Sequence, residues 1–198
     1  PTSATAAAAA SRSGSDVAAT GQTLSQQLAA DDFSLFQLPR GYRLDRSLLD
    51  ARWKDLQREA HPDKFAAQGA ASQRVALQWS VRINEAYQRL KDPLKRAAYL
   101  CELGGAPIQA EVNTAMPAAF LMQQMAWREA LEEAQTLPDL ASLHDDVVRV
   151  RREHLAACER QLDQDQDFSQ AAATVRALMF IERFASDIEN RLDSMGER

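Results

Sequence analysis

DRSLLDARWKDLQREAHPDKFAAQG, residues 45–69, combines an amphipathic helix with a loop that a proline interrupts. Asp45 is suited to cap the start of this helix. Apolar residues then recur at spacings of four, three and four, which places them on one face: Leu49, Trp53, Leu56 and Ala60. Lys54 and Arg58 point the other way. Pro62 ends the periodic pattern, so the stretch as far as Gly69 is expected to be a loop.

A second long helix is expected over residues 71–90, of similar length and period to the first. Its apolar stripe consists of Val75, Trp79, Ile83, Ala86, Tyr87 and Leu90. Two amphipathic helices joined by a short loop pack antiparallel. Asp92-Pro93 then indicates a new helix, with an N-cap residue followed by proline, and Gly104-Gly105 indicates its end.

The N-terminal stretch, residues 1–31, is expected to be a disordered tail. It is rich in Ala, Ser, Thr and Gln and lacks aromatic residues, so it cannot offset its ordering entropy by burial. Order is expected to begin at Asp32, with a short apolar helix that Pro39 and Gly41 close off. The apolar residues of that helix are Phe33, Leu35, Phe36 and Leu38.

The C-terminal half is expected to follow a linker over residues 105–116. Three helical segments, at about 117–135, 139–166 and 168–193, carry apolar seams suited to a three-helix bundle. No stretch shows sustained strand alternation, so the fold class is predicted to be all-α. The predicted organisation is a first helical domain over 32–104 and a second over 117–198.

Charge and cysteine content restrict the function classes. Residues 40–99 carry a net charge of +6 and residues 100–198 one of −9, which suggests two modules that attract different partners. No apolar run approaches the ~20 residues needed to cross a bilayer, and no apolar block of a signal peptide follows the start, so a soluble protein is expected. The two cysteines, Cys101 and Cys158, form no CxxC pair, which fits a reducing cytosol without a disulfide framework or zinc site.

The placement of His61-Pro62-Asp63 is more informative than the tripeptide itself. It lies between two long helices, about thirty residues ahead of Lys91-Asp92-Pro93-Leu94-Lys95-Arg96. This arrangement resembles the J-domain family over residues 32–104. The flanking sequences resemble the HscB-type co-chaperones of iron–sulfur cluster biogenesis in the segments FSLFQLP (33–39), DLQR (55–58), HPDKF (61–65), AFLM (119–122) and AAATVR (171–176).

The resemblance implies that the N-terminal domain docks on an HscA-type chaperone ATPase of the DnaK class and promotes its ATP hydrolysis. The residues implied in chaperone binding are His61, Pro62, Asp63, Lys54, Arg58 and Lys64. Their chemistry fits, because Asp63 can pair with an arginine and the cations can meet an acidic patch. The alternative is that Asp63 is a simple turn residue and Lys54 and Arg58 lie on a solvated helix face.

The helix at 117–135 has two apolar faces. Phe120, Trp127, Leu131 and Ala134 share one side, whereas Leu121, Met122 and Met125 lie roughly opposite. A bundle needs one of them, and a surplus Met-rich face with charged neighbours is typical of partner docking. The alternative is that both faces are buried, the second against the first domain.

The resemblance assigns the surplus face to an IscU-type iron–sulfur scaffold. The residues implied in scaffold binding are Leu121, Met122, Met125, Arg128, Glu129, Glu133 and Phe180. Ala126 is a departure, because some relatives carry an acidic residue there. The predicted function is therefore to stimulate the chaperone ATPase and to deliver the scaffold to it.

Two other functions stay open. A general J-domain holdase would bind unfolded chains through the Met-rich face, and a nucleic-acid-binding role for the basic segment is less favoured because its aromatic residues lie on core stripes. No enzymatic signature, cofactor or metal site is expected, since His144 and His154 lack a second ligand at metal spacing. Animal-type relatives carry a CxxC pair before the J-domain; its absence here suggests a bacterial cytoplasmic protein without nucleic-acid or membrane partners.

Overall fold

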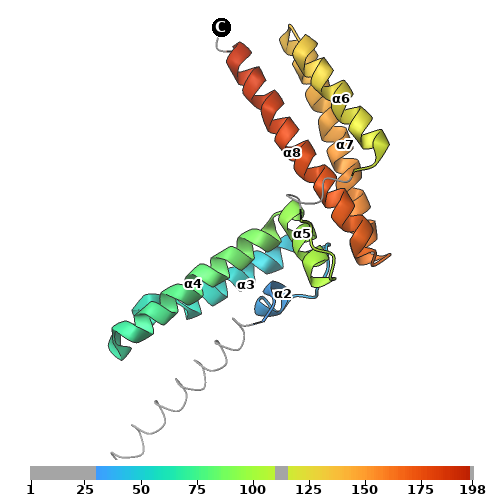
Figure 1. The fold of residues 1–198 in the computed structure, drawn as a ribbon. Helices are drawn as coiled ribbons and strands as arrows, with labels where there is room; N and C mark the ends of the chain where they lie inside the picture. Colours follow the sequence, from blue (N-terminus) through green and yellow to red (C-terminus); the bar gives the residue numbers. More distant parts are fainter. Residues whose placement is uncertain (1–29, 110–115, 197–198) are drawn as a thin grey trace, which may run out of the picture. The chain divides into compact units, whose positions relative to one another are not determined.

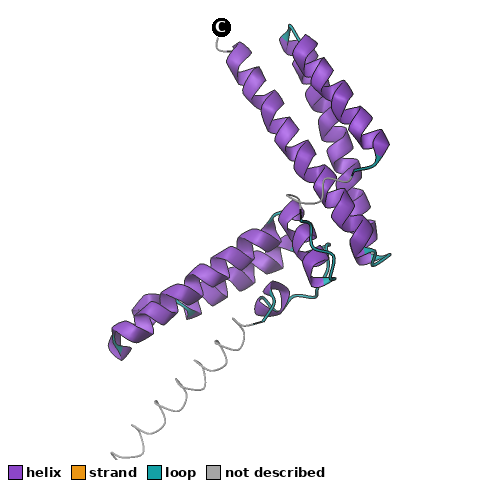
Figure 2. Cartoon of the chain, viewed as in Figure 1, coloured by secondary structure: helices purple, strands orange, loops and turns teal. Residues whose placement is uncertain are grey.

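The computed structural model describes residues 30–109 and 116–196, and every regular element in these ranges is helical (Figures 1 and 2). This confirms the all-α fold class. The described residues form two compact units: residues 30–40 with 45–90, and residues 41–44 with 91–196. The predicted tail lies outside the described residues up to position 29, as does the linker over 110–115.

The first unit is an antiparallel helical hairpin with a short preceding helix. Its elements are α2 (Asp32–Leu35), α3 (Arg46–Glu59), the 3₁₀ helix η1 (Pro62–Gln68) and α4 (Ala70–Lys91). The side chain of Asp45 accepts the backbone N–H groups of Ser47 and Leu48, which confirms it as the N-cap of α3. The prediction of a loop from Pro62 onward is wrong in detail, because these residues form η1. This helix ends at Gly69, which has a φ of 91°.

Cross-helix contacts fix the register of the hairpin. The ring of Trp53 on α3 stacks on Tyr87 of α4 with centroids 4.7 Å apart, and its indole N–H donates to Asn84 at 2.9 Å. Nearer the tip, the Ser80 hydroxyl donates to the carbonyl of Ala60 at 3.2 Å. Residue numbers rise along one helix as they fall along the other, so the predicted antiparallel pairing is confirmed.

One member of the predicted α4 stripe was wrong. Val75 is 42% exposed, and the neighbouring Ala76 is fully buried in its place. Consecutive residues of a helix are about 100° apart, so a stripe that begins at Ala76 passes through Ile83, Tyr87 and Leu90 without including Val75.

The second unit contains α5 (Pro93–Leu103), α6 (Ala118–Glu133), α7 (Leu137–Asp163) and α8 (Phe168–Gly196). Helices α6, α7 and α8 lie side by side (Figure 1). A capping box starts α7, in which Thr136 and Asp139 bond each other's backbone. The three helices match the predicted segments with ends shifted by up to three residues.

Helix α5 packs against α8 and α7, although the resemblance assigns it to the J-domain. The contact with α8 is close at Gly104, where an added Cβ would lie 2.2 Å from the ring of Phe168. Residues 41–44 also belong to the second unit: the Asp163 carboxylate accepts the backbone N–H groups of Tyr42 at 2.6 Å and Arg43 at 2.8 Å. The domain limits at residues 104 and 117 therefore stay a prediction.

Candidate functional site

The turn at the tip of the hairpin has a locally determined shape. His61 is the N-cap of η1, and its Nδ1 accepts the backbone N–H of Asp63 at 3.3 Å. Pro62 occupies the first turn, where its fixed φ suits the helix and its missing N–H costs nothing. The N–H of Lys64 donates to the His61 carbonyl at 3.0 Å. These bonds brace the turn from within.

The carboxylate of Asp63 points into solvent, with 90% of its side chain exposed. His61 Nδ1 lies 3.6 Å from its Oδ2 and accepts the backbone N–H of Asp63. Within the described parts of the chain, no lysine or arginine side chain pairs with this carboxylate. Asp63 is consequently presented as a charged acceptor that can meet an arginine in a bidentate pair.

The turn is held against α4 by an aromatic contact. The ring of Phe65 meets Trp79 edge to face, with centroids 5.7 Å apart. Such a pair adds about 0.5–1.5 kcal/mol beyond the area that it buries. Together with the bond from Ser80 to Ala60, this contact fixes the position of the turn on the hairpin.

Three cations surround the turn or lie on the outer face of α3. Lys54, Arg58 and Lys64 are all exposed, as predicted. The Arg58 guanidinium bonds Asp55 one turn earlier, and its Nε donates to the Lys54 carbonyl at 3.3 Å. Exposed ion pairs of this kind contribute little to stability. A carboxylate on a partner can therefore take the place of Asp55 as the acceptor for Arg58.

Helix α6 keeps its two apolar faces apart. Phe120 and Trp127 are 8% and 2% exposed, whereas Met122 and Met125 are 72% and 71% exposed and Leu121 is 46% exposed. We call the exposed set the α6 outer face: Leu121, Met122, Met125, Arg128, Glu129 and Glu133. The surplus face predicted from the sequence is therefore present, and the packing of the second unit leaves it exposed.

Phe180 of α8 belongs both to the core and to the surface. Its ring meets Phe120 edge to face and stacks on Phe184, with centroids 5.9 Å apart in each pair. The Arg128 guanidinium covers it at 5.7 Å from the ring centroid. The structure thus places Phe180 next to the α6 outer face, as expected, and its side chain is half-buried.

The other sequence candidates are structural. No group of three or more His, Cys, Asp or Glu side chains in the described ranges is arranged to hold a metal ion. Burial raises the pKa of Cys101 to about 11 and that of Cys158 to about 12, so both thiols stay protonated and unreactive at neutral pH. Nδ1 of His154 lies 2.9 Å from the Val150 carbonyl, and its ring packs against Phe120.

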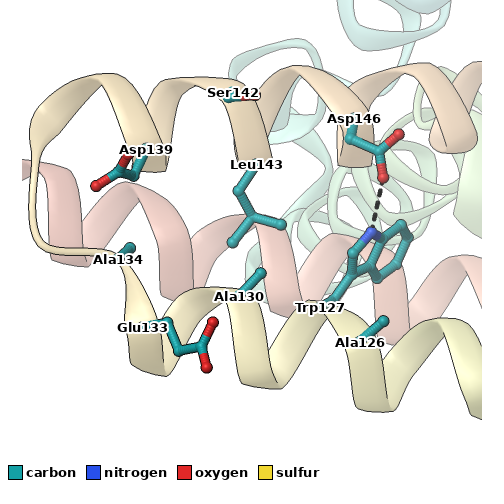
Figure 3. A pocket seen from close by; sticks show the side chains of 9 residues that line it. All are labelled: Ala126, Trp127, Ala130, Glu133, Ala134, Asp139, Ser142, Leu143 and Asp146. Atoms are coloured by element: carbon teal, nitrogen blue, oxygen red, sulfur yellow. Dashed lines mark hydrogen bonds between the residues drawn. The ribbon is translucent and has the colours of Figure 1, made fainter.

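Sequence reasoning missed a groove between α6 and α7, to which α7 contributes Asp139, Ser142, Leu143 and Asp146 (Figure 3). The signal available was the spacing of Ala126, Ala130 and Ala134, one small residue per turn, which leaves room beside the neighbouring helix. The spacing alone does not indicate which helix lies opposite.

Comparison with known proteins identifies the family. The chain is 48% identical to the co-chaperone protein HscB homologue of Burkholderia thailandensis over 166 residues, which span 82% of this chain and 94% of that protein. This chain belongs to the HscB co-chaperone family. The homologue of Cupriavidus taiwanensis is 46% identical over 87% of this chain and 99% of its own length. Residues 116–189 match the family model described as the HSCB C-terminal oligomerisation domain.

Solved HscB structures share the fold. Chaperone HscB from Vibrio cholerae superposes with a TM-score of 0.72 at 36% identity, covering 84% of this chain and 99% of that one. Human co-chaperone HscB gives a TM-score of 0.73 at 28% identity, covering 85% and 83%. The chain is thus a co-chaperone with the J-domain and helical-bundle architecture of HscB. Across residues 30–109 and 116–196, the helices are too short or too polar to span a bilayer.

Proposed function

We propose that this HscB-family protein stimulates the ATPase of an HscA-type chaperone and delivers an IscU-type iron–sulfur scaffold to it, in the bacterial cytoplasm. The observation that carries the proposal is the exposed Asp63 carboxylate on a turn held between two paired helices. The protein performs no chemistry itself. It supplies binding energy that favours the hydrolysing conformation of its partner.

Charge and rigidity support the chaperone-binding site. Asp63 offers a carboxylate to an arginine of the ATPase, and Lys54, Arg58 and Lys64 offer cations to an acidic surface around it. His61 and Pro62 act as positioning residues, because the bond from Asp63 N–H to His61 fixes the turn before the partner arrives. Less ordering entropy is then lost on binding.

The scaffold-binding site is the α6 outer face with Phe180 beside it. Leu121, Met122 and Met125 provide adaptable apolar contact, and Arg128, Glu129 and Glu133 provide the polar rim. Met122 and Met125 are expected to contribute most, since they are the most exposed apolar side chains on this face and have the most area to lose.

Asp63→Ala tests the chaperone-binding role. The substitution should lower the stimulated ATPase rate of the chaperone by about tenfold or more, because a buried charged pair would lose one partner. Asp63 makes few intramolecular contacts, so circular dichroism should be unchanged, and scaffold affinity should match that of the wild type. Glu85→Gln, at an exposed position of α4, is the control. Stimulation retained by Asp63→Ala would refute the mechanism.

The rival function is a holdase for unfolded chains, which the adaptable pair Met122 and Met125 would also suit. Competition separates the two. If the site is specific for a folded scaffold, Met122→Ser should weaken scaffold binding, and an excess of unfolded polypeptide should not displace the scaffold from the wild-type protein. Displacement by the unfolded polypeptide would favour the holdase.

A further inference from the structure

The groove between α6 and α7 has an apolar floor and a volume of about 610 Å³. Trp127, Ala130 and Leu143 form the floor (Figure 3). The indole of Trp127 is fixed from both sides, since its ring stacks on Phe184 at 5.6 Å and its N–H donates to Asp146 at 2.8 Å. The floor is therefore preformed, which lowers the cost of binding.

Carboxylates line the groove, and none of its nine lining residues is cationic. Glu133 comes from α6, and Asp139 and Asp146 come from α7 (Figure 3). The hydrogen bond from Trp127 and the nearby Arg149 guanidinium hold the pKa of Asp146 below its ordinary value. Bonds from the hydroxyl and backbone N–H of Thr136 lower the pKa of Asp139. Both carboxylates are thus charged at neutral pH, and Arg149 offsets part of the charge of Asp146.

The groove is continuous with the α6 outer face. Glu133 belongs to both surfaces, and Ala126 of the groove follows Met125 of the outer face directly. A partner seated on Met122 and Met125 therefore has the groove at its edge. Whatever part of the partner lies there meets an apolar floor and three carboxylates.

We propose that the α6–α7 groove binds a cationic segment of the protein that docks on the α6 outer face. Lysine or arginine side chains of that segment pair with Glu133, Asp139 and Asp146, and their aliphatic stems lie over Trp127 and Ala130. The inference rests on the proposed function, because it takes the scaffold as the docking protein. Two carboxylates of α7, Asp139 and Asp146, thereby extend the scaffold-binding site, and the segment that they recognise is positively charged.

Ser142→Arg tests the groove directly. Ser142 lines the groove and is exposed, so the substitution places a bulky cation where the cationic segment should lie. We expect the Kd for an IscU-type scaffold, measured by calorimetry on the full chain, to rise by about tenfold. Ala156→Arg adds the same side chain at an exposed α7 position that does not line the groove, and it should change the Kd by less than about twofold.

Asp146→Asn tests the charge without the bulk. Asparagine keeps an acceptor for the Trp127 indole and removes the negative charge. The variant should bind the scaffold more weakly by about threefold, and its affinity should fall less steeply than that of the wild type between low and high salt, because one screened attraction is gone. An unchanged salt dependence together with normal affinity for Ser142→Arg would overturn the proposal.

The outcomes separate the groove from the proposed function. Loss of scaffold binding on Met122→Ser, with Ser142→Arg binding normally, overturns the groove proposal alone.

If the wild type does not bind the scaffold, the proposed function falls. The probe is then a lysine-bearing helical peptide of 16 residues, which is the length of α6. Peptide binding that Ser142→Arg removes and Ala156→Arg keeps supports the groove; no peptide binding overturns it. Self-association that Ser142→Arg abolishes would also overturn it, since the occupant would be a second copy.

Discussion

At the residue scale, a single buried carboxylate holds α2 on the hairpin. Asp32 is fully buried, and its two oxygens meet the guanidinium groups of Arg82 at 2.6 Å and Arg89 at 2.9 Å, both on α4. The sequence places Asp32 at the start of the ordered chain without indicating these partners, because they lie fifty residues or more further along. Its role follows only from the tertiary structure.

Asp32→Asn should lower the free energy of unfolding by about 1–3 kcal/mol, since both arginines would lose a charged acceptor that is excluded from water. Partial exposure of Arg82 and Arg89 keeps the loss below that of a fully buried pair. Urea denaturation at neutral pH measures the effect. Glu85→Gln on the same helix serves as the control, and equal midpoints for the two variants would contradict the assignment.

Asp146 should also make the free energy of unfolding depend on pH. Its pKa is lowered in the folded state, chiefly by the Trp127 indole, so the carboxylate stabilises the fold at pH values above the ordinary 3.8. That contribution is lost as the pH falls below this value, because the unfolded chain then binds the proton more readily. The free energy of unfolding should therefore drop less between pH 6 and about pH 3 in Asp146→Asn than in the wild type. An identical drop in both proteins would argue against this contribution.

At the element scale, periodicity and capping predicted most helices because they are local properties. Asp45 and Asp92 cap α3 and α5 as expected, and the two faces of α6 follow from residue spacing alone. The 3₁₀ helix after Pro62 was missed, because a proline-interrupted stretch with one glycine at its end has no period long enough to detect. The half-buried position of Phe180 does not follow from residue spacing alone, since its partner Phe120 lies on another helix.

Gly104 tests the packing between α5 and α8. Gly104→Ala should destabilise the second unit by about 1–3 kcal/mol, because its Cβ would meet the ring of Phe168 at its root and not at a flexible end. Gly196→Ala should have almost no effect, because its Cβ would meet no atom of another element within 4 Å in the described residues. Thermal unfolding of the two variants compares them. Equal melting temperatures would show that the contact is looser than described.

At the scale of the whole molecule, the charge asymmetry read from the sequence matches the two proposed sites. The positive segment carries the turn at residues 61–63, and the negative segment carries the α6 outer face and the groove. The class of fold and both candidate faces could be predicted from the sequence. The place of α5 and of residues 41–44 in the second unit could not, because it depends on contacts with α7 and α8.

Asp163 is expected to protect the segment at residues 41–44. Removing its carboxylate with Asp163→Ala should speed hydrogen exchange of the Tyr42 and Arg43 backbone N–H groups, which it accepts at 2.6 and 2.8 Å. Exchange in the middle of α4 should be unchanged. Asp165→Ala, at an exposed position just beyond α7, is the matched control. Unaltered protection at Tyr42 would mean that other contacts hold the segment.

The most direct test of the account is the ATPase rate of an HscA-type chaperone, measured with and without an IscU-type scaffold for three forms of this protein. The wild type should raise the rate, and the scaffold should raise it further. Met122→Ser should keep the first effect and lose most of the second, whereas Asp63→Ala should lose both. Full stimulation by Asp63→Ala would contradict the claim that the exposed carboxylate at the tip of the hairpin acts on the chaperone.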